Sequence, residues 1–259
     1  MTLNSVIVRG SYKGPSGYDH HVREFVRELW RHGVAVELRD IPEWTAAKLP
    51  HPLRDPWFDT LAQPRDASLL LHCCMPWQVA VESGRVNVNF TMFEATSIPR
   101  LWASHSLTHD LVIVPTASSR RAWLASGVPA ERLAVCPLGI DPERFGPAVA
   151  PLPLEIQPGQ PIAHRRIRIL NVSEMGPRKN VLGLLRAWLK ATSPKDDAIL
   201  LLKLGCYGPG WHHELQGRIT DLERSVGKTL SQAAAVHFIF DLFADADMPR
   251  LFASASHYI

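Results

Sequence analysis

A glycine-rich turn near the amino terminus holds the first residues that could bind a ligand. Gly14, Ser16 and Gly17 lie in GSYKGPSGYD, between an apolar run at 5–8 and an amphipathic segment at 18–32. Glycines let the backbone turn tightly and approach a ligand, and a serine can cap the following helix. The N–H groups at that helix start suit a phosphate or a sugar hydroxyl. The spacing is not G-x-G-x-x-G, which disfavours a dinucleotide oxidoreductase. A turn without a ligand is the alternative.

A basic pair, Arg178 and Lys179, stands in a second such turn. It follows the apolar run at 167–172 and precedes an amphipathic segment, in the sequence SEMGPRKN. Positive charge at a helix N-terminus opposes the helix dipole, so it is unfavourable unless an anion is bound there. A diphosphate would supply that anion through charge-assisted hydrogen bonds. A solvated basic pair is the alternative.

Two polar residues, Thr91 and Glu94, follow a third apolar run, at 86–90. Ligands of open α/β sheets bind at the carboxyl ends of the strands, so both residues are expected at a ligand-binding edge. A lone glutamate in this position could equally cap a helix.

Spacing typical of metal ligands is absent from the sequence. The adjacent histidine pairs at 20–21 and 212–213 direct their side chains apart, and there is no HExxH motif. The four cysteines form no CxxC pair; they are Cys73, Cys74, Cys136 and Cys206. We therefore expect no metal, no disulfide framework, buried reduced thiols and a cytoplasmic protein.

Apolar runs that alternate with amphipathic segments must position these residues. Near-continuous runs of Val, Ile and Leu separated by helices indicate a parallel sheet buried on both faces. Residues 148–164 are proline-rich and without helical or strand period, which is typical of a linker. We expect two Rossmann-like doubly wound α/β domains, at 1–147 and 165–259. The expected strands are 5–8, 34–38, 68–72, 86–90, 111–114, 133–136, 167–172, 198–204, 236–240 and 256–259, and the expected helices are 18–32, 117–126, 180–191, 214–226 and 248–253.

Composition excludes several classes of protein. Of 259 residues, 46% are hydrophobic and 20% charged, which is ordinary for a globular protein, and the net charge of +3 does not indicate a nucleic-acid binder. No apolar stretch is long enough to cross a bilayer, and the first residues do not have the pattern of a secretory signal. Membrane association is not indicated.

Four segments together resemble the retaining glycosyltransferases of the GT-B fold, in particular family 4. They are GPSGY, FTMFEATSIPRLW, DLVIVPTASSRRAWLASGVPAERLAVCPLGIDPERFGP and LNVSEMGPRKNVLGLLRAW, of which the third is the most specific. The resemblance implies transfer of a sugar from a nucleotide-diphosphate sugar to an acceptor with retention of configuration. It also implies a donor on the second domain, an acceptor mostly on the first, and no metal or other cofactor.

The resemblance also implies a role for each candidate residue. Arg178 and Lys179 would be the catalytic pair that neutralises the departing diphosphate, with Ser173 and Gly17 as further donor contacts. The acceptor-binding residues would be Gly14, Ser16, Gly17, Thr91 and Glu94.

The chain departs from the family pattern at two places. Ser173 and Glu174 stand where the family often has a glycine, and the family's Glu-x7-Glu donor motif would lie beyond Ile259. We therefore expect an incomplete second domain with an unpaired sheet edge open to self-association, and weak or no turnover by the chain alone. The alternative is a non-catalytic binding or partner subunit with this fold. The PlGiD and RKN blocks argue against a third possibility, a GT-B epimerase.

Overall fold

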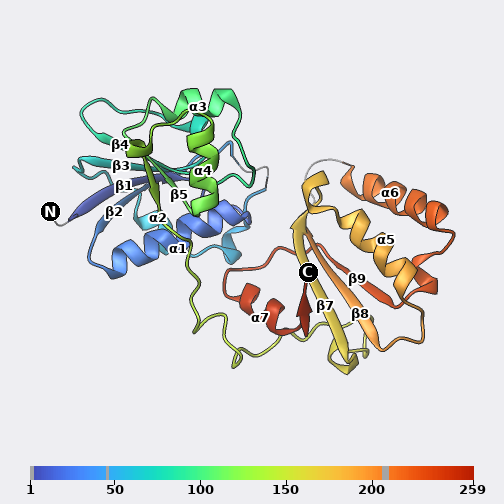
Figure 1. Cartoon of the computed structure of the whole chain (residues 1–259). Coiled ribbons are helices and arrows are strands. Elements are labelled where there is room, and N and C mark those ends of the chain that lie inside the picture. Colours follow the sequence, from blue (N-terminus) through green and yellow to red (C-terminus); the bar gives the residue numbers. More distant parts are fainter. Residues whose placement is uncertain (1–2, 45–46, 206–209) are drawn as a thin grey trace. The chain divides into compact units, whose positions relative to one another are not determined.

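The chain forms two compact α/β units. The computed structural model describes residues 3–44, 47–205 and 210–259, and it divides into Met1–Ile140 and Asp141–Ile259 (Figure 1). Each unit has one parallel sheet covered by helices, as the alternation of apolar runs predicts. The division precedes the expected boundary at residue 147.

The first unit has a six-stranded parallel sheet in the order β2-β1-β3-β4-β5-β6. This order places β1 where strand order reverses, with β2 on one side and β3 on the other, so the loops after β1 and β3 flank the switch point at which such sheets bind ligands. The strands are β1 Ser5–Gly10, β2 Ala35–Arg39, β3 Leu69–Cys73, β4 Val86–Phe90, β5 Leu111–Val114 and β6 Leu133–Val135.

Helices cover both faces of this sheet (Figure 1). Helix α1, Gly17–Arg31, packs Val22 and Val26 against Val6 and Val8 of β1 on one face. Helices α3, Arg100–Ser106, and α4, Ala117–Ala125, pack on the other face against β5. The short helix α2, Trp57–Thr60, adds Phe58 to the core beside α1. Buried apolar side chains therefore fix the start of α1 beside the end of β1.

A row of polar residues crosses the face opposite α1. Arg9 is in register with His72, and His72 with Asn89. His72 and Asn89 are fully buried, and burial lowers the pKa of His72 to about 4. The Asn89 side chain donates to the backbone oxygens of His72 and Cys74, at 3.0 and 2.9 Å. These bonds tie the end of β4 to the loop after β3.

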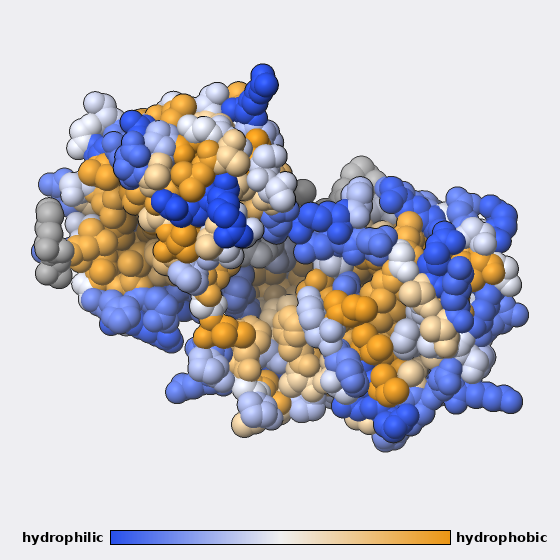
Figure 2. Space-filling model, viewed as in Figure 1, coloured by the Kyte–Doolittle hydropathy of each residue, from blue (hydrophilic) through white to orange (hydrophobic). Residues whose placement is uncertain are grey.

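The second unit has a four-stranded parallel sheet in the order β10-β7-β8-β9. Helices α5 and α6 cover one face, and α7 covers the other (Figure 1). In the view of Figure 2, the outer side of α6 is mostly hydrophilic. The elements are β7 Ile167–Glu174, α5 Val181–Ala191, β8 Ala198–Gly205, α6 Trp211–Val226, β9 Ala235–Ile239, α7 Asp247–Ala253 and β10 His257–Tyr258.

The proline-rich stretch at 148–164 is packed onto the second unit. Leu152, Leu154 and Ile156 contact the core that includes Leu170 and Leu251. Glu155 bridges Pro161 in antiparallel fashion, and Ile162, in the 3₁₀ helix Ile162–His164, is 2% exposed. Proline removes helical and strand periodicity without preventing burial of the apolar side chains between prolines. The stretch expected to be a linker therefore belongs structurally to the second unit.

Other differences from the sequence-based expectations are small. The observed strands begin or end within one or two residues of the expected ones, and no helix was expected at α2 or α3. Cys73 and Cys74 are buried and reduced, and burial raises the pKa of both thiols, whereas Cys136 is half-buried. Cys206 lies outside the described residues. Within the described ranges, no helix has the length and hydropathy needed to cross a bilayer.

Candidate functional site

The turn between β1 and α1 is closed by the carboxylate of Asp19. Asp19 is fully buried, and it accepts hydrogen bonds from the Ser11 hydroxyl at 2.6 Å and the Gly14 amide at 2.7 Å. It also accepts from the Ser16 hydroxyl and from the Ser16 amide, the latter at 3.3 Å. Ser16 in turn caps α1 by accepting from the Asp19 amide at 3.2 Å. The Asp19 carboxylate therefore takes up amide and hydroxyl donors of the turn that could otherwise bind an anion.

Arg23 stabilises the same turn through hydrogen bonds to its backbone. Arg23 is 4% exposed, and its guanidinium donates to the backbone oxygens of Tyr12 and Gly14, at 2.6 and 2.9 Å. With its amide donating to Asp19 and its carbonyl accepting from Arg23, Gly14 is committed to the turn itself. Gly17 is exposed, and a Cβ placed there would meet nothing within 4 Å. Of the three residues expected to contact a ligand here, Gly17 is the one that faces solvent openly.

Tyr18 joins this turn to the segment after β4. Its hydroxyl accepts from the Met92 amide at 2.9 Å and lies 3.9 Å from Sδ of Met75 in the loop after β3. Its ring packs against Trp44 with centroids 4.6 Å apart, and burial raises its pKa to about 12. A single side chain thus ties together the three strand ends at the switch point of the first sheet.

Thr91 and Glu94 have different environments. Thr91 is fully buried, its amide donates to the Ile113 backbone oxygen at 3.0 Å, and its hydroxyl has no hydrogen-bond partner among the described residues. Glu94 is exposed. Both come after β4 as predicted, but Thr91 lies beneath the surface because it continues the buried strand. Thr91 can therefore support a ligand-binding site from the interior, whereas Glu94 can line such a site.

In the second unit, the turn between β7 and α5 places its basic pair in solvent. Arg178 and Lys179 form the 3₁₀ helix Pro177–Lys179 and are exposed, and α5 has no acidic residue in its first turn. Asn180, which precedes α5, has a φ of 48°, in the left-handed region. A Cβ at Gly183 would lie 2.7 Å from Cγ of Asn180, so the absence of a side chain there makes room for the asparagine. In contrast to the Asp19 turn, this turn has no internal carboxylate in the first turn of its helix.

The sheet order places that turn where doubly wound sheets bind ligands. Strand β7 lies between β8, which follows it in sequence, and β10, the last strand, so strand order reverses beside β7. Ser173, near the end of β7, donates its hydroxyl proton to Oδ1 of Asn171 at 2.7 Å, which leaves the oxygen able to accept. The donor residues expected in this unit are therefore gathered at one strand end and the turn that follows it.

Sequence reasoning missed a cavity of about 220 Å³ on the same edge of the second sheet. Arg218 in its wall donates to Glu214 at 2.6 Å, and the Trp211 ring stacks on His212 with centroids 3.4 Å apart. The only signal in the sequence was the aromatic and polar start of α6. The cavity is lined by Glu174, Met175, Gly205, Trp211, Glu214, Leu215 and Arg218.

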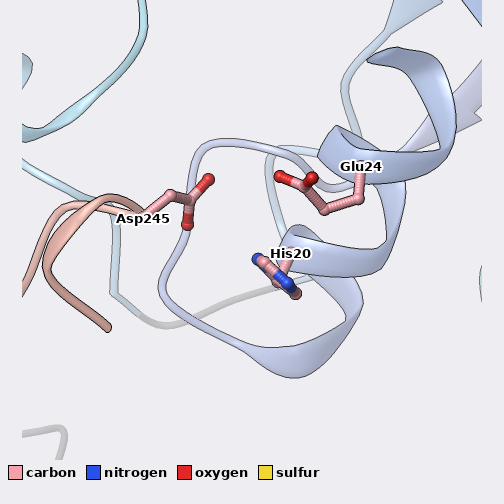
Figure 3. A group of neighbouring side chains, drawn as sticks. All are labelled: His20, Glu24 and Asp245. Carbon is pink, nitrogen blue, oxygen red and sulfur yellow. The ribbon is translucent and has the colours of Figure 1, made fainter. Parts of the chain in front are cut away.

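Neither histidine pair supplies a set of metal ligands within its own unit. Figure 3 shows His20 and Glu24 one turn apart on α1. Asp245, which is drawn with them, belongs to the second unit, and two side chains supply too few ligands for a protein metal site. His21 points inward, packs edge-on against Phe90 at 4.7 Å, and has its pKa lowered to about 4 by burial.

Comparison with known proteins identifies the fold. No family model matches the sequence, and no curated protein matches it. Among solved structures, HepE of Anabaena in complex with UDP and glucose is 17% identical, with a TM-score of 0.57 over 99% of this chain and 73% of HepE. The UDP-forming α,α-trehalose-phosphate synthase of Burkholderia xenovorans in complex with glucose-6-phosphate is 13% identical, with a TM-score of 0.58 over 98% of this chain and 78% of the synthase.

A third solved structure, OtsA in its apo form, is 12% identical, with a TM-score of 0.57 over 98% of this chain and 77% of OtsA. At such identities the likeness establishes the fold alone. The chain therefore has the two-unit α/β fold of the GT-B glycosyltransferases, as the four sequence blocks predict.

Proposed function

We propose that the protein is a glycosyltransferase that moves a sugar from a nucleotide-diphosphate sugar to a hydroxyl acceptor with retention of configuration. The observation that carries the proposal is the exposed Arg178 and Lys179 turn, at the switch point of the second sheet, in a chain with the GT-B fold. HepE was solved with UDP and with UDP-glucose, and an α-glucosyltransferase of similar structure was solved with UDP-glucose, which supports a nucleotide-sugar donor.

The basic pair suits the chemistry of the donor. As the bond from the anomeric carbon to the diphosphate oxygen breaks, negative charge grows on the diphosphate. Arg178 and Lys179 would stabilise that charge, helped by the amide groups at the start of α5. The acceptor oxygen bonds to the anomeric carbon, and its proton passes to the departing phosphate. Ser173 would accept a hydrogen bond from the donor. No step needs a metal ion, because the two cations supply the charge.

The first unit suits a neutral acceptor. Gly17 is open to solvent and Glu94 is exposed near the same strand ends, so both could contact an acceptor hydroxyl. Gly14, Ser16 and Thr91 would act indirectly, because Gly14 and Ser16 bond within the turn and the Thr91 amide bonds to the Ile113 backbone oxygen of β5. We propose Gly17 as an acceptor contact and leave the donor contacts to the second unit.

Titration with UDP, followed by a nucleotide-release assay over a panel of nucleotide sugars, tests the proposal. We expect UDP or another nucleoside diphosphate to bind, and Lys179→Ala to weaken donor use by about 1–3 kcal/mol, the range for a charge-assisted hydrogen bond. Lys190→Ala is the matched control, because Lys190 is an exposed lysine in the last turn of α5, the helix that follows the Lys179 turn. NMR of the product's anomeric proton tests retention.

Two outcomes would count against the proposal. Equal effects of Lys179→Ala and Lys190→Ala would remove Lys179 from the donor site. Nucleotide-sugar binding without any release across the panel would favour the alternative of a non-catalytic subunit that retains the donor site.

A further inference from the structure

Three aromatic rings from separate segments meet at the carboxyl edge of the first sheet. Trp77 lies in the 3₁₀ helix Pro76–Gln78 after β3, Phe93 lies three residues after β4, and Trp102 lies in α3. The ring centroids of Trp77 and Trp102 are 4.8 Å apart, and those of Phe93 and Trp102 are 4.6 Å apart. We call these three residues the aromatic platform.

The platform is anchored on one side and open on the other. Phe93 and Trp102 are half-buried and pack on the core beneath α3 and α4. Trp77 is 46% exposed, although a tryptophan ring gains much from burial. Its backbone is fixed on both sides, because Arg9 donates to the Gln78 backbone oxygen at 2.6 Å and the Gln78 side chain accepts from the Met75 amide at 3.1 Å. The Trp77 ring, which contacts Trp102, thus presents an apolar surface to solvent on a fixed backbone.

Tyr18 connects the platform to the turn that we propose for the acceptor. The two residues that Tyr18 contacts through its hydroxyl, Met75 and Met92, stand two residues before Trp77 and directly before Phe93. Glu94, which directly follows Phe93, is exposed. The platform is therefore continuous with the strand ends at the switch point, where ligands of doubly wound sheets bind.

A sugar ring is the ligand whose chemistry fits this combination. One face of a pyranose carries several C–H groups of partial positive charge, which the negative face of an indole attracts, while the hydroxyls at its rim need polar partners. Trp77 offers an exposed indole, and Glu94, which directly follows Phe93 in the sequence, offers an exposed carboxylate. We propose that the aromatic platform binds the acceptor by stacking a pyranose ring on Trp77, so that the acceptor is a carbohydrate. This inference rests on the proposed function, since it assigns the acceptor class to the same strand-end region.

The test measures binding of unreactive sugars separately from use of the donor. Calorimetric titrations of the whole chain with maltotriose, mannotriose and UDP are compared for the original sequence, Trp77→Ala, Trp77→Phe and Trp30→Ala. Trp30 is the matched control, because it is 57% exposed and lies in the last turn of α1. Thermal melts identify any variant that does not fold.

We expect at least one trisaccharide to bind, with affinity lowered about tenfold by Trp77→Ala, largely restored by Trp77→Phe and unchanged by Trp30→Ala. UDP binding should be the same in all four proteins. If no trisaccharide binds, or if Trp77→Ala and Trp30→Ala behave alike, the platform proposal is overturned, whatever the UDP result.

Two further results separate this proposal from others. If the unaltered chain binds a trisaccharide but neither binds UDP nor releases a nucleotide, the proposed function is overturned and the platform remains a sugar site. The chain could instead bind phosphatidylglycerol vesicles and no sugar. If Trp77→Ala abolished that vesicle binding, the platform proposal would be overturned in favour of a lipid surface.

Discussion

A methyl group added at Gly10 would strike the contact that positions α1 on the first sheet. Gly10 ends β1 and is in register with Cys73 of β3. A Cβ at this position would lie 2.7 Å from Cγ2 of Val22, 3.1 Å from the backbone oxygen of Cys73 and 3.2 Å from its Cβ. Val22 and Cys73 are both fully buried, so neither can move without displacing α1 or β3.

The expected magnitude follows from these three contacts. Overpacking of a well-packed core costs about 1–3 kcal/mol, and replacing a strand glycine by alanine returns about 0.5–1 kcal/mol by reducing the freedom of the unfolded chain. Gly10→Ala should therefore lower the free energy of unfolding by about 1–2 kcal/mol. At roughly 2–4 °C per kcal/mol for a chain of this size, its melting temperature should fall by about 2–8 °C.

Gly17→Ala is the matched control within the same turn. A Cβ at Gly17 meets nothing within 4 Å, and Gly17 does not have a positive φ. This variant should melt within about 2 °C of the original sequence, because surface changes of this kind are within about 0.5 kcal/mol. It should nevertheless raise the KM for the acceptor if Gly17 contacts it. Differential scanning calorimetry and urea unfolding measure both variants. Equal stability of Gly10→Ala and the original, or a greater loss in Gly17→Ala, would refute the packing argument.

Three further predictions concern charge. Asp19→Asn should lower the free energy of unfolding by about 1–3 kcal/mol, because a neutral amide cannot accept from all four donors of the turn, which belong to Ser11, Gly14 and Ser16. Urea unfolding measures the loss, with Asp221→Asn at an exposed position of α6 as the control. Burial lowers the pKa of His72 to about 4 from 6.5, so the unfolded chain binds more protons between these values. The contribution of His72 to stability is therefore fully present above pH 6.5, and up to about 3 kcal/mol of it is lost as the pH falls to about 4. Urea midpoints measured from pH 7 to 4 should fall, and His72→Asn should reduce the fall by this share. Dialysis against EDTA should leave nucleotide release unchanged, and a loss that Mg²⁺ restores would contradict a metal-free mechanism.

Strand positions were predictable because both sheets are parallel and buried. The run 111–114 is wholly apolar and the run 86–90 alternates Val with Asn, and the structure has strands at the same residues. Helix α3 was not predicted, because its seven residues have neither a side-chain cap nor an acidic first turn, and its packing comes from Trp102 and Ala103 meeting a distant core. Local sequence patterns do not predict such long-range contacts.

For the proline-rich stretch, the sequence predicted the local backbone but not the packing. Proline spacing at 148–164 predicts the absence of helix and strand, and the structure has only one short 3₁₀ helix and an isolated bridge there. Burial of Ile162 and contact of Leu154 with the second core depend on tertiary packing. Composition therefore indicated the backbone type and could not indicate to which unit the stretch belongs.

The contrast between the two strand-to-helix turns decides which one suits an anion. From composition alone, the glycine-rich turn before α1 suited a phosphate as well as a hydroxyl. Ser16 and Asp19 have the spacing of a capping box, however, and in the structure the Asp19 carboxylate accepts from the Gly14 amide and from the Ser16 amide and hydroxyl. A second negative charge would be repelled there. The turn before α5 has two cations and no acidic residue in the first helical turn, so it is the one that favours a diphosphate. On this basis we propose that the donor phosphates bind at the turn of the second unit and that the turn of the first unit suits a neutral acceptor.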